Sequence, residues 1–450
     1  MTKVVRITKG LDIPLKGEAE KIIKELPITQ VAIKPTDFIG VFPKLLVKEG
    51  DPVQVGSPVF FNKYREEILF TSPVSGHITE IRRGDKRVLL EVRIEADGNQ
   101  TTIDFDAADP NELSRNDIVK KMIDSGVWPL LRQRPYSVIA NPSEIPKAIH
   151  IPAFDTSPLA PDYDFIVHGK GDFFQTGLDA LTKLTNGNVC LNVHATQTIS
   201  KVFMNSKKVQ IMAYEGPHPA GNVSVHIQHS SPLNKGDVVW YLYPQDVITI
   251  GKLFKTGHYD VSTVIALTGS EVKHPVYFKS IRGAVVIGML ENNLKEGNIR
   301  IISGNVLTGT QIRPHGYVGF YNSMVTVIPE GSYYEFLGWA LPGFSKFSFS
   351  RTFFSWLASK KKKYVLDTNY HGGVKAYVMT GQYEKVMPLD ILPMQLIKAC
   401  LVEDIDLMEG LGIYEVDEED FALCEYLDTS KTEIQSIIRK GLDLMRKEMS

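Results

Sequence analysis

The chain has 450 residues, of which 43% are apolar and 23% charged, and its 50 Lys and Arg balance 52 Asp and Glu to leave a formal charge of −2. At about 100–200 residues per domain, this length predicts three or four domains, and the composition is that of an ordinary folded protein. The near-neutral charge argues against a phosphate-binding surface over the whole molecule, so nucleic acid is not an expected partner.

The sequence also argues against a membrane-spanning helix and against a four-cysteine site. A spanning helix needs about 20 consecutive apolar residues, and the best apolar stretch, Gly283–Leu290, is far too short. The first ten residues are basic but no apolar core follows them, so no signal peptide is expected. Cys190, Cys400 and Cys424 lie far apart. This suits a reducing cytoplasm and excludes a four-cysteine zinc or iron–sulfur site within one chain.

The first hundred residues are predicted to be β structure, because short apolar runs alternate with Gly, Pro and Asp turns. The expected strands are Val31–Ile33, Val59–Phe61, Ile68–Phe70, His77–Ile81 and Val88–Ile94. A polar, acidic stretch at Thr101–Pro110 is predicted to be a linker.

Strands and helices alternate in the next part of the chain, which indicates an α/β domain with a largely parallel sheet. The expected helices are Asn116–Ser125 and Phe174–Leu184. The expected strands are Tyr136–Ala140, Lys147–Ile151, Asp164–Val167, Val189–Val193, Val209–Met212 and Asn222–Gln228.

The remaining chain is predicted to hold a small α+β domain and a helical ending. Strands return between 261 and 329, with one short helix at Val286–Leu290, and helices are expected at Leu389–Leu411 and Lys431–Met449. Between them lies an aromatic-rich and glycine-rich stretch that contains the tetralysine Lys360–Lys363. The tetralysine is interpreted as a solvated loop, and contact with anionic lipid headgroups is the alternative.

Two local patterns, Val47–Gly56 and Ser72–Ile78, are similar to the turn and strand of the barrel-sandwich fold in biotinyl and lipoyl carrier domains. Such carriers present a modified lysine at a hairpin tip, and Lys63 lies near that place. The residues around Lys63 differ from the carrier motif, so a plain surface lysine is the favoured interpretation. A carrier protein modified at Lys63 is kept as an alternative.

Two further motifs carry little chemistry. His218, His226 and His229 are close in sequence, but the last two would point to opposite faces of the expected strand, which disfavours a metal site. Gly169–Gly171 precedes an expected helix, yet the third glycine of a dinucleotide fingerprint is missing at the right spacing.

Longer stretches, taken together and in order, resemble one family, the A-subunits of the bacterial sodium-translocating NADH:quinone oxidoreductase (Na⁺-NQR). The stretches that carry this resemblance are Lys9–Pro14, Ile81–Leu89, Gly126–Pro129, Arg132–Ser137, Asp155–Ala160, Gly216–Gly221, Tyr243–Ile248, Arg300–Gly304, Tyr383–Asp390 and Asp417–Asp420. They run from near residue 1 to near residue 425.

The resemblance implies a fold in four parts. These are a barrel-sandwich hybrid over 1–100, a degenerate Rossmann-like domain over 111–258 related to the flavin subunit of complex I, a β-grasp-like (SLBB) domain over 259–330, and a C-terminal region over 331–450 that ends in helices. The chain would therefore be an α/β and α+β multidomain protein.

The resemblance also implies a function, as part of a translocase. The complex oxidises NADH, reduces ubiquinone and exports Na⁺. The A-subunit would be a peripheral protein at the cytoplasmic face of the inner membrane, in contact with the membrane-embedded B-subunit and the other subunits. Flavins, iron–sulfur centres and the NADH site would belong to those partners. This chain would bind no cofactor tightly and would not be catalytic alone.

Related flavin subunits, in complex I and the Rnf complex, carry a glycine-rich loop at the head of the α/β domain. The corresponding stretch here is Trp128–Pro135, which has no glycine. Close backbone approach to a phosphate needs glycine, so flavin binding is not expected there. Cys400 and Cys424 are too few for an iron–sulfur cluster. An Rnf-like or complex I-like flavin subunit remains the second alternative.

A quinone site would offer aromatic walls and one or two donors to the quinone carbonyls. Two segments have these residue types, Asp37–Phe42 and Leu131–Tyr136, and we hypothesise that they approach one another. The predicted quinone-binding residues are Phe38, Ile39, Phe42, Arg132, Arg134 and Tyr136.

Overall fold

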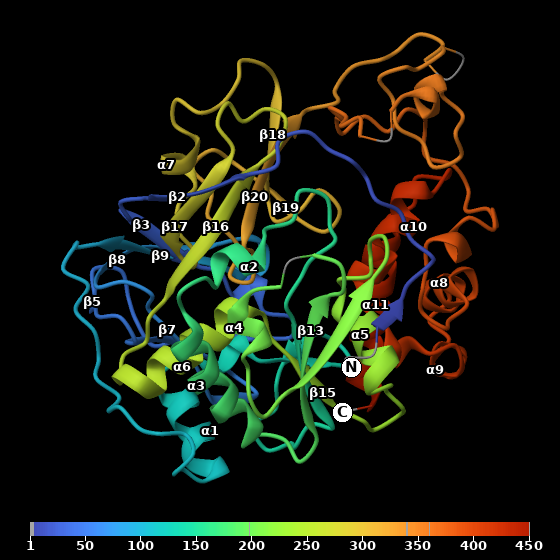
Figure 1. The fold of residues 1–450 in the computed structure, drawn as a ribbon. Coiled ribbons are helices and arrows are strands. Elements are labelled where there is room, and N and C mark those ends of the chain that lie inside the picture. Colours follow the sequence, from blue (N-terminus) through green and yellow to red (C-terminus); the bar gives the residue numbers. More distant parts are fainter. Residues whose placement is uncertain (1–3, 198, 339–340, 360, 450) are drawn as a thin grey trace.

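The computed structural model describes residues 4–197, 199–338, 341–359 and 361–449. Four sheets and the helices around them make up a body from which one loop-rich segment projects (Figure 1). The multidomain α/β and α+β architecture expected from the sequence is confirmed.

Two small antiparallel sheets face one another in the barrel-sandwich part. One has the strand order β3-β9-β8-β5 and the other β4-β6-β7. Their strands are β3 (Gln30–Ile33), β4 (Pro43–Leu45), β5 (Pro52–Val53), β6 (Pro58–Asn62), β7 (Arg65–Thr71), β8 (Gly76–Arg83) and β9 (Leu89–Ala96). Val31, Phe60 and Val92 are fully buried in the core between them. All five expected strands are therefore found.

The α/β part is built on a seven-stranded sheet with the order β1-β14-β13-β12-β15-β10-β11. β1, β14, β13, β12 and β15 run parallel, and β10 runs antiparallel to β15. The strands are β1 (Val4–Arg6), β10 (Arg132–Arg134), β11 (Val138–Ile139), β12 (Ala148–Pro152), β13 (Asn188–His194), β14 (Gln210–Glu215) and β15 (Val239–Tyr241). The helices are α1 (Arg115–Asp124), α2 (Tyr163–Ile166), α3 (Gly171–Thr182), α4 (Lys201–Met204), α5 (Val223–Ser230) and α6 (Pro244–Thr256).

Two of the expected strands in this part are wrong, because both segments are helical. Residues 164–167 lie largely in α2, whose first turn is capped by Asp162 as its carboxylate accepts a hydrogen bond from the Phe165 amide. Asn222–Gln228 falls largely in α5, where five consecutive residues are buried. In a short apolar run, the periodicity of apolar residues cannot distinguish a helix from a strand. When a segment is buried on several sides, it also lacks the alternation of polar and apolar residues that would distinguish them.

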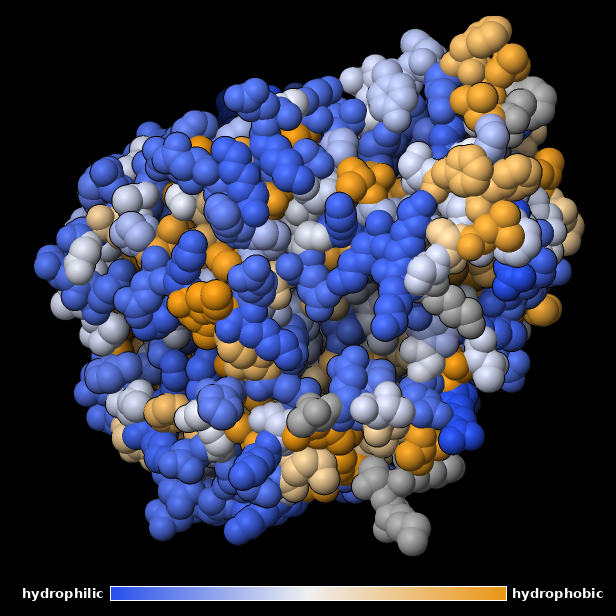
Figure 2. Space-filling view, turned by 45° about the horizontal axis from the view of Figure 1, so that its top comes forward, coloured by the Kyte–Doolittle hydropathy of each residue, from blue (hydrophilic) through white to orange (hydrophobic). Residues whose placement is uncertain are grey.

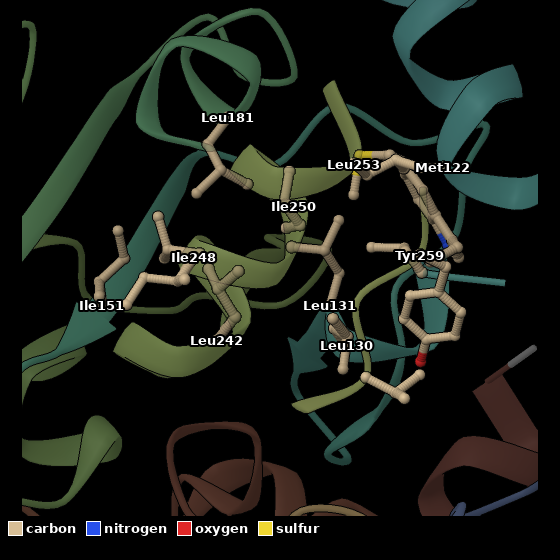
Figure 3. Close-up of a cluster of buried hydrophobic side chains, with 14 of the residues drawn as sticks. Met122, Leu130, Leu131, Ile151, Leu181, Leu242, Ile248, Ile250, Leu253 and Tyr259 are labelled. Carbon is tan, nitrogen blue, oxygen red and sulfur yellow. The ribbon is translucent and has the colours of Figure 1, made fainter. Parts of the chain in front are cut away.

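Helices α3 and α6 pack closely against each other over one face of the sheet. A Cβ on Gly251 would lie 1.8 Å from the carbonyl oxygen of Phe173, so only glycine permits this approach. Figure 3 shows Leu181 of α3 and Ile250 of α6 within the cluster of apolar side chains that this packing buries, together with Leu131. The same cluster includes Ile151 of β12 and Leu242, which follows β15.

The β-grasp-like part is a six-stranded sheet with the order β19-β18-β20-β16-β17-β2. Its elements are β2 (Glu20–Glu25), β16 (Ser262–Thr268), β17 (Val276–Ile281), α7 (Ile287–Leu290), β18 (Ile299–Ser303), β19 (Thr310–Ile312) and β20 (Met324–Pro329). β2 comes from the N-terminal segment, and β1 joins the α/β sheet. The N-terminal residues thus connect two sheets.

The C-terminal region consists of a projecting segment and a helical cluster (Figure 1). The helices are α8 (Pro393–Leu401), α9 (Ile405–Gly410), α10 (Ala422–Leu427) and α11 (Ile434–Met449). The single helix expected at Leu389–Leu411 is divided, because Glu403 adopts a positive φ and Asp404 caps a new helix. None of the described helices combines the length and the apolar character that crossing a bilayer requires.

Candidate functional site

A cavity of about 190 Å³ opens where the carboxyl ends of the parallel strands meet the β-grasp-like part. From β12 the chain builds β13 and then β14 on one side, and it later returns to place β15 on the other side of β12. The direction in which strands are added therefore reverses at β12. Open α/β sheets bind ligands in the crevice that forms at such a switch point. The lining residues that bear polar or aromatic groups include Arg132, Asp155, Tyr163, His218, Tyr243, Tyr321, Asn322 and Glu419.

Arg132 is the cation of this cavity. It begins β10 and pairs with Tyr241 at the carboxyl end of β15. Its guanidinium carbon lies 4.5 Å from the ring centroid of Tyr241, 5.5 Å from that of Tyr243 and 4.2 Å from that of Tyr321. Burial lowers the pKa of Arg132, but the three tyrosines and Glu419 outweigh it, so the group stays charged. Its Nε is buried without a hydrogen-bond partner.

Burial shifts the pKa values of Asp155, His218 and Glu419 at the cavity toward their neutral forms. Burial raises the pKa of Asp155 and lowers that of His218 to about 4, and His218 Nδ1 lies 3.1 Å from the hydroxyl of Thr156. Burial also raises the pKa of Glu419 to about 7. The cavity therefore presents one cation, Arg132, beside carboxyl and imidazole groups whose ionisation is disfavoured by burial.

Arg134 lies behind this wall instead of in it. Its side chain is 2% exposed and forms ion pairs with Asp417 at 2.8 Å and Glu419 at 2.7 Å. Glu419 lines the cavity. Arg134 therefore holds the Glu419 carboxyl group in position from behind the cavity wall. Of the six residues predicted to bind quinone, Arg132 is the one that lines the cavity directly.

Phe38 does not line this cavity, but it contacts two aromatic residues of the β-grasp-like part. Its ring lies 4.8 Å from that of Phe320 and 5.7 Å from that of Tyr321. Tyr321 is also stacked on Arg132. Each of the two segments that we expected to approach one another thus has one residue in contact with Tyr321, Phe38 in the first and Arg132 in the second.

The other predicted residues lie elsewhere. Ile39 is partly buried, and Phe42 is 52% exposed with its ring 5.0 Å from that of Tyr64. Tyr136 packs against Tyr414 in the C-terminal region, 6.3 Å away. The structure thus does not bring all six residues into one cluster.

Sequence reasoning missed Tyr243, Tyr321 and Glu419 as neighbours of Arg132. Tyr243 and Glu419 fall within the family-like stretches, which gives no reason to place them beside Arg132. Nothing in the sequence around Tyr321 points to a site. The contact between them depends on the packing of three separate parts of the chain.

Comparison with known proteins gives the family. Three family models match, described as "NqrA N-terminal barrel-sandwich hybrid domain" over residues 5–97, "NqrA second alpha/beta domain" over 113–259 and "NQRA C-terminal domain" over 264–313. A relative from Photorhabdus laumondii, named as the A-subunit of Na(+)-translocating NADH-quinone reductase, is 39% identical over 449 residues, which cover 99% of this chain and 100% of the relative. The chain belongs to this NqrA family.

Further relatives agree. The protein of the same description from Pasteurella multocida is 38% identical over 449 residues, 99% of this chain and 100% of the relative. A crystal structure of NAD⁺-reducing [NiFe]-hydrogenase aligns with a TM-score of 0.34 and 8% identity over 68% of this chain and 55% of that chain, a similarity too weak to support an argument.

In this member of the NqrA family, much of the stretch Trp128–Pro135 is part of the core. Trp128, Leu130 and Leu131 are fully buried. The Trp128 indole donates a hydrogen bond to the carbonyl of Ala140 at 2.8 Å, and its ring meets that of Trp240 edge-on.

The histidines of this family member are also placed by the fold. His218 lines the cavity, whereas His226 is fully buried on α5 with Nε2 3.0 Å from the carbonyl of Ala220. Among the described residues, no group of His, Cys, Asp and Glu is arranged to hold a metal ion.

Proposed function

We propose that this chain is the peripheral NqrA component of a membrane complex that couples NADH oxidation and ubiquinone reduction to Na⁺ export. In this proposal it lies at the cytoplasmic face of the bacterial inner membrane, against the membrane-embedded B-subunit. It contributes to quinone interaction and to assembly, while flavins, iron–sulfur centres and the NADH site are in its partners. The full-length similarity to relatives that are named as this component supports the proposal.

The cavity supplies the quinone interaction in this proposal. A quinone headgroup is a flat ring with two carbonyl acceptors, and it needs donors and aromatic walls. Arg132 offers a charged donor with an unpartnered buried Nε, and the Asn322 amide lies at the same cavity. Tyr243 and Tyr321 provide ring surfaces beside it. The unpartnered donor on Arg132 is the observation that carries this part of the proposal.

The other predicted residues have distinct roles in the proposal. Arg134 orients Glu419, and Phe38 supports Tyr321 from behind. Ile39, Phe42 and Tyr136 stay predicted quinone contacts outside the cavity. Changing them one by one therefore separates a headgroup site in the cavity from a second place of contact.

Titration of the purified full chain with a short-tailed ubiquinone by calorimetry tests the cavity. Arg132→Gln is expected to weaken binding about tenfold or more, because a hydrogen bond from a charged donor is lost. Arg115→Gln is the matched control, since Arg115 is a partly buried arginine on α1 that donates to the carbonyls of Pro142 and Glu144. Equal quinone affinity in Arg132→Gln and the unaltered chain would remove the cavity from the proposal.

The carrier alternative has one structural observation in its favour. Lys63 is exposed in the turn between β6 and β7, at a hairpin tip. Its ammonium lies 5.6 Å from the ring centroid of Tyr64. Intact mass of the purified chain decides, because biotin or lipoate adds a defined increment, and an absorbance scan for flavin tests the Rnf-like alternative.

A further inference from the structure

The segment 331–381 leaves the β-grasp-like part after β20 and projects from the body before the C-terminal helices begin (Figure 1). We call it the basic projection. Its 51 residues contain seven Lys and Arg but two Asp and Glu, and 13 of them are aromatic, although the whole chain has a charge of −2 and 10% aromatic residues. The described part has one short 3₁₀ helix, Phe354–Leu357, so loops present most of these side chains.

Large apolar side chains of the basic projection are exposed to solvent. Tyr334 is fully exposed, Phe336 is 88% exposed and Leu357 is 64% exposed. Phe344 and Trp356 are more than half exposed. Figure 2 shows the apolar side chains gathered at the upper right of the molecule, with hydrophilic ones between them. A contiguous exposed apolar surface of this kind marks an interaction site.

The charges of the basic projection are sorted by position. Its two acidic residues are held inside the segment: Glu335 pairs with Lys346, and Asp367 accepts a hydrogen bond from the Tyr333 hydroxyl at 2.6 Å. Arg351 and Lys361 are exposed. The outer surface therefore presents cations and aromatic rings together.

We propose that the basic projection rests on the headgroup layer of an anionic phospholipid bilayer. Trp and Tyr prefer the membrane–water interface, and Lys and Arg gain from anionic headgroups while their stems lie along apolar surface. Protein–protein interfaces, by contrast, are depleted in lysine at their cores. The mixture of exposed rings and cations on loops therefore favours lipid over a protein partner.

The basic projection is tied to the body around Tyr364 and again near its C-terminal end, where the Lys375 amide donates to the carbonyl of Ser430 at 3.0 Å. The Tyr364 amide donates to the carbonyl of Pro14 at 2.8 Å, and the Lys16 amide donates to the carbonyl of Tyr364 at 2.9 Å. Lys363 forms an ion pair with Glu18 at 2.7 Å. These contacts hold the basic projection against the body. The inference is independent of the quinone cavity.

Cosedimentation of the full chain with vesicles tests the inference. The vesicles contain phosphatidylcholine alone or with about a third of phosphatidylglycerol, and binding is expected only to the second. Lys361→Ala is expected to weaken it about fivefold, the effect of one cation near an anionic surface. The double variant Phe336→Ser with Trp356→Ser is expected to weaken vesicle binding about tenfold or more. It removes two aromatic rings that, in this inference, are buried among the lipid headgroups on binding.

The control is Lys86→Ala with Val88→Ser, which removes an exposed cation and a half-exposed apolar side chain from the turn between β8 and β9. This variant is expected to bind like the unaltered chain. Thermal unfolding of each variant establishes that it is folded. Two results overturn the inference: no binding to anionic vesicles, which would leave a protein partner for this surface, or equal losses in the control and the projection variants.

Discussion

Arg134 is the centre of a buried ionic network between β10 and the C-terminal region. It pairs with Asp417 and Glu419, while Arg439 of α11 pairs with Glu418 at 2.9 Å and with Asp417 at 3.4 Å. Burial raises the pKa of Asp417, but Arg134 outweighs it and lowers the pKa to about 2. Burial and the charge of Asp417 raise the pKa of Glu418 to about 9. Arg134 therefore favours the charged form of Asp417, whereas burial disfavours the charged form of Glu418.

Replacing Arg134 should destabilise the fold strongly. Arg134→Met is expected to lower the free energy of unfolding by about 3–5 kcal/mol, because it leaves buried carboxylates without their cation. Urea denaturation of the purified chain measures the change. Arg6→Met is the control, since Arg6 pairs with Glu215 but its side chain is 79% exposed, and less than about 1 kcal/mol is expected there. Similar losses in both variants would contradict a buried network.

His226 gives the chain a dependence on pH. Burial lowers its pKa to about 3, below the ordinary value of 6.5, so the imidazole is neutral in the folded chain and takes up a proton on unfolding. Below pH 6.5 the imidazole binds a proton in the unfolded chain but not in the folded chain. The free energy of unfolding therefore falls as the pH decreases from 6.5 toward 3.

His226→Gln should therefore reduce the acid sensitivity of the fold. Between pH 4 and 6, the free energy of unfolding of the unaltered chain is expected to change with pH more steeply than that of the variant, by about 1.4 kcal/mol per pH unit. Denaturant titrations at several pH values give both slopes. His77→Gln serves as the control, because His77 is exposed. Parallel slopes for the unaltered chain and His226→Gln would show that His226 is charged in the folded state.

The packing of α11 against α8 holds the C-terminal region together. Ile434, Ile438, Leu442 and Met445 line one buried stripe of α11. Gly441 faces α8 in the same contact, and a Cβ there would lie 2.6 Å from Cys400 Sγ. The two helices can approach this closely because residue 441 has no side chain.

Gly441→Leu is expected to lower the free energy of unfolding by about 1–3 kcal/mol, because the new side chain overfills this contact. It should also expose Cys400, which is buried in the unaltered chain, to a thiol reagent. Lys440→Leu, at the exposed neighbouring position, is expected to change neither quantity appreciably. Labelling of Cys400 at the unaltered rate in Gly441→Leu would show that the contact accommodates the larger side chain and would contradict the prediction.

The N-terminal segment joins the parts of the whole molecule. β1 pairs with β14 of the α/β sheet, and β2 pairs with β17 of the β-grasp-like sheet. The chain then enters the barrel-sandwich part. About 25 residues therefore contribute a strand to each of two other sheets before the barrel-sandwich part begins. The cavity lies where these parts meet, with walls from the α/β part, the β-grasp-like part and the C-terminal region.

The purified chain alone is expected to transfer no electrons from NADH to an artificial acceptor, because the proposed function assigns the flavins and the NADH site to other subunits. Loss of NADH absorbance measures turnover, and the assembled complex is the positive control. Turnover by the isolated chain would contradict the proposed division of roles within the complex.

The sequence by itself determined the family, the barrel-sandwich strands and the long amphipathic helix at the C-terminus. These features depend on local turn chemistry and on periodicity within one segment, so a single chain reveals them. It also singled out Arg132, whose type suits a carbonyl acceptor. The two strands expected in α2 and α5 were wrong, because short apolar runs fit either structure.

Only the tertiary structure decided which residues surround Arg132. Tyr321 and Glu419 lie about 190 and 290 positions away in sequence, and each reaches the cavity through the packing of a different part of the molecule. The tertiary structure also decided that Arg134 is an internal ion-pair partner. Arg134 is buried because the Asp417–Asp420 segment packs over it, and this packing exists only in the folded molecule. Contacts of such long range follow from the relative placement of whole sheets, which no local pattern encodes.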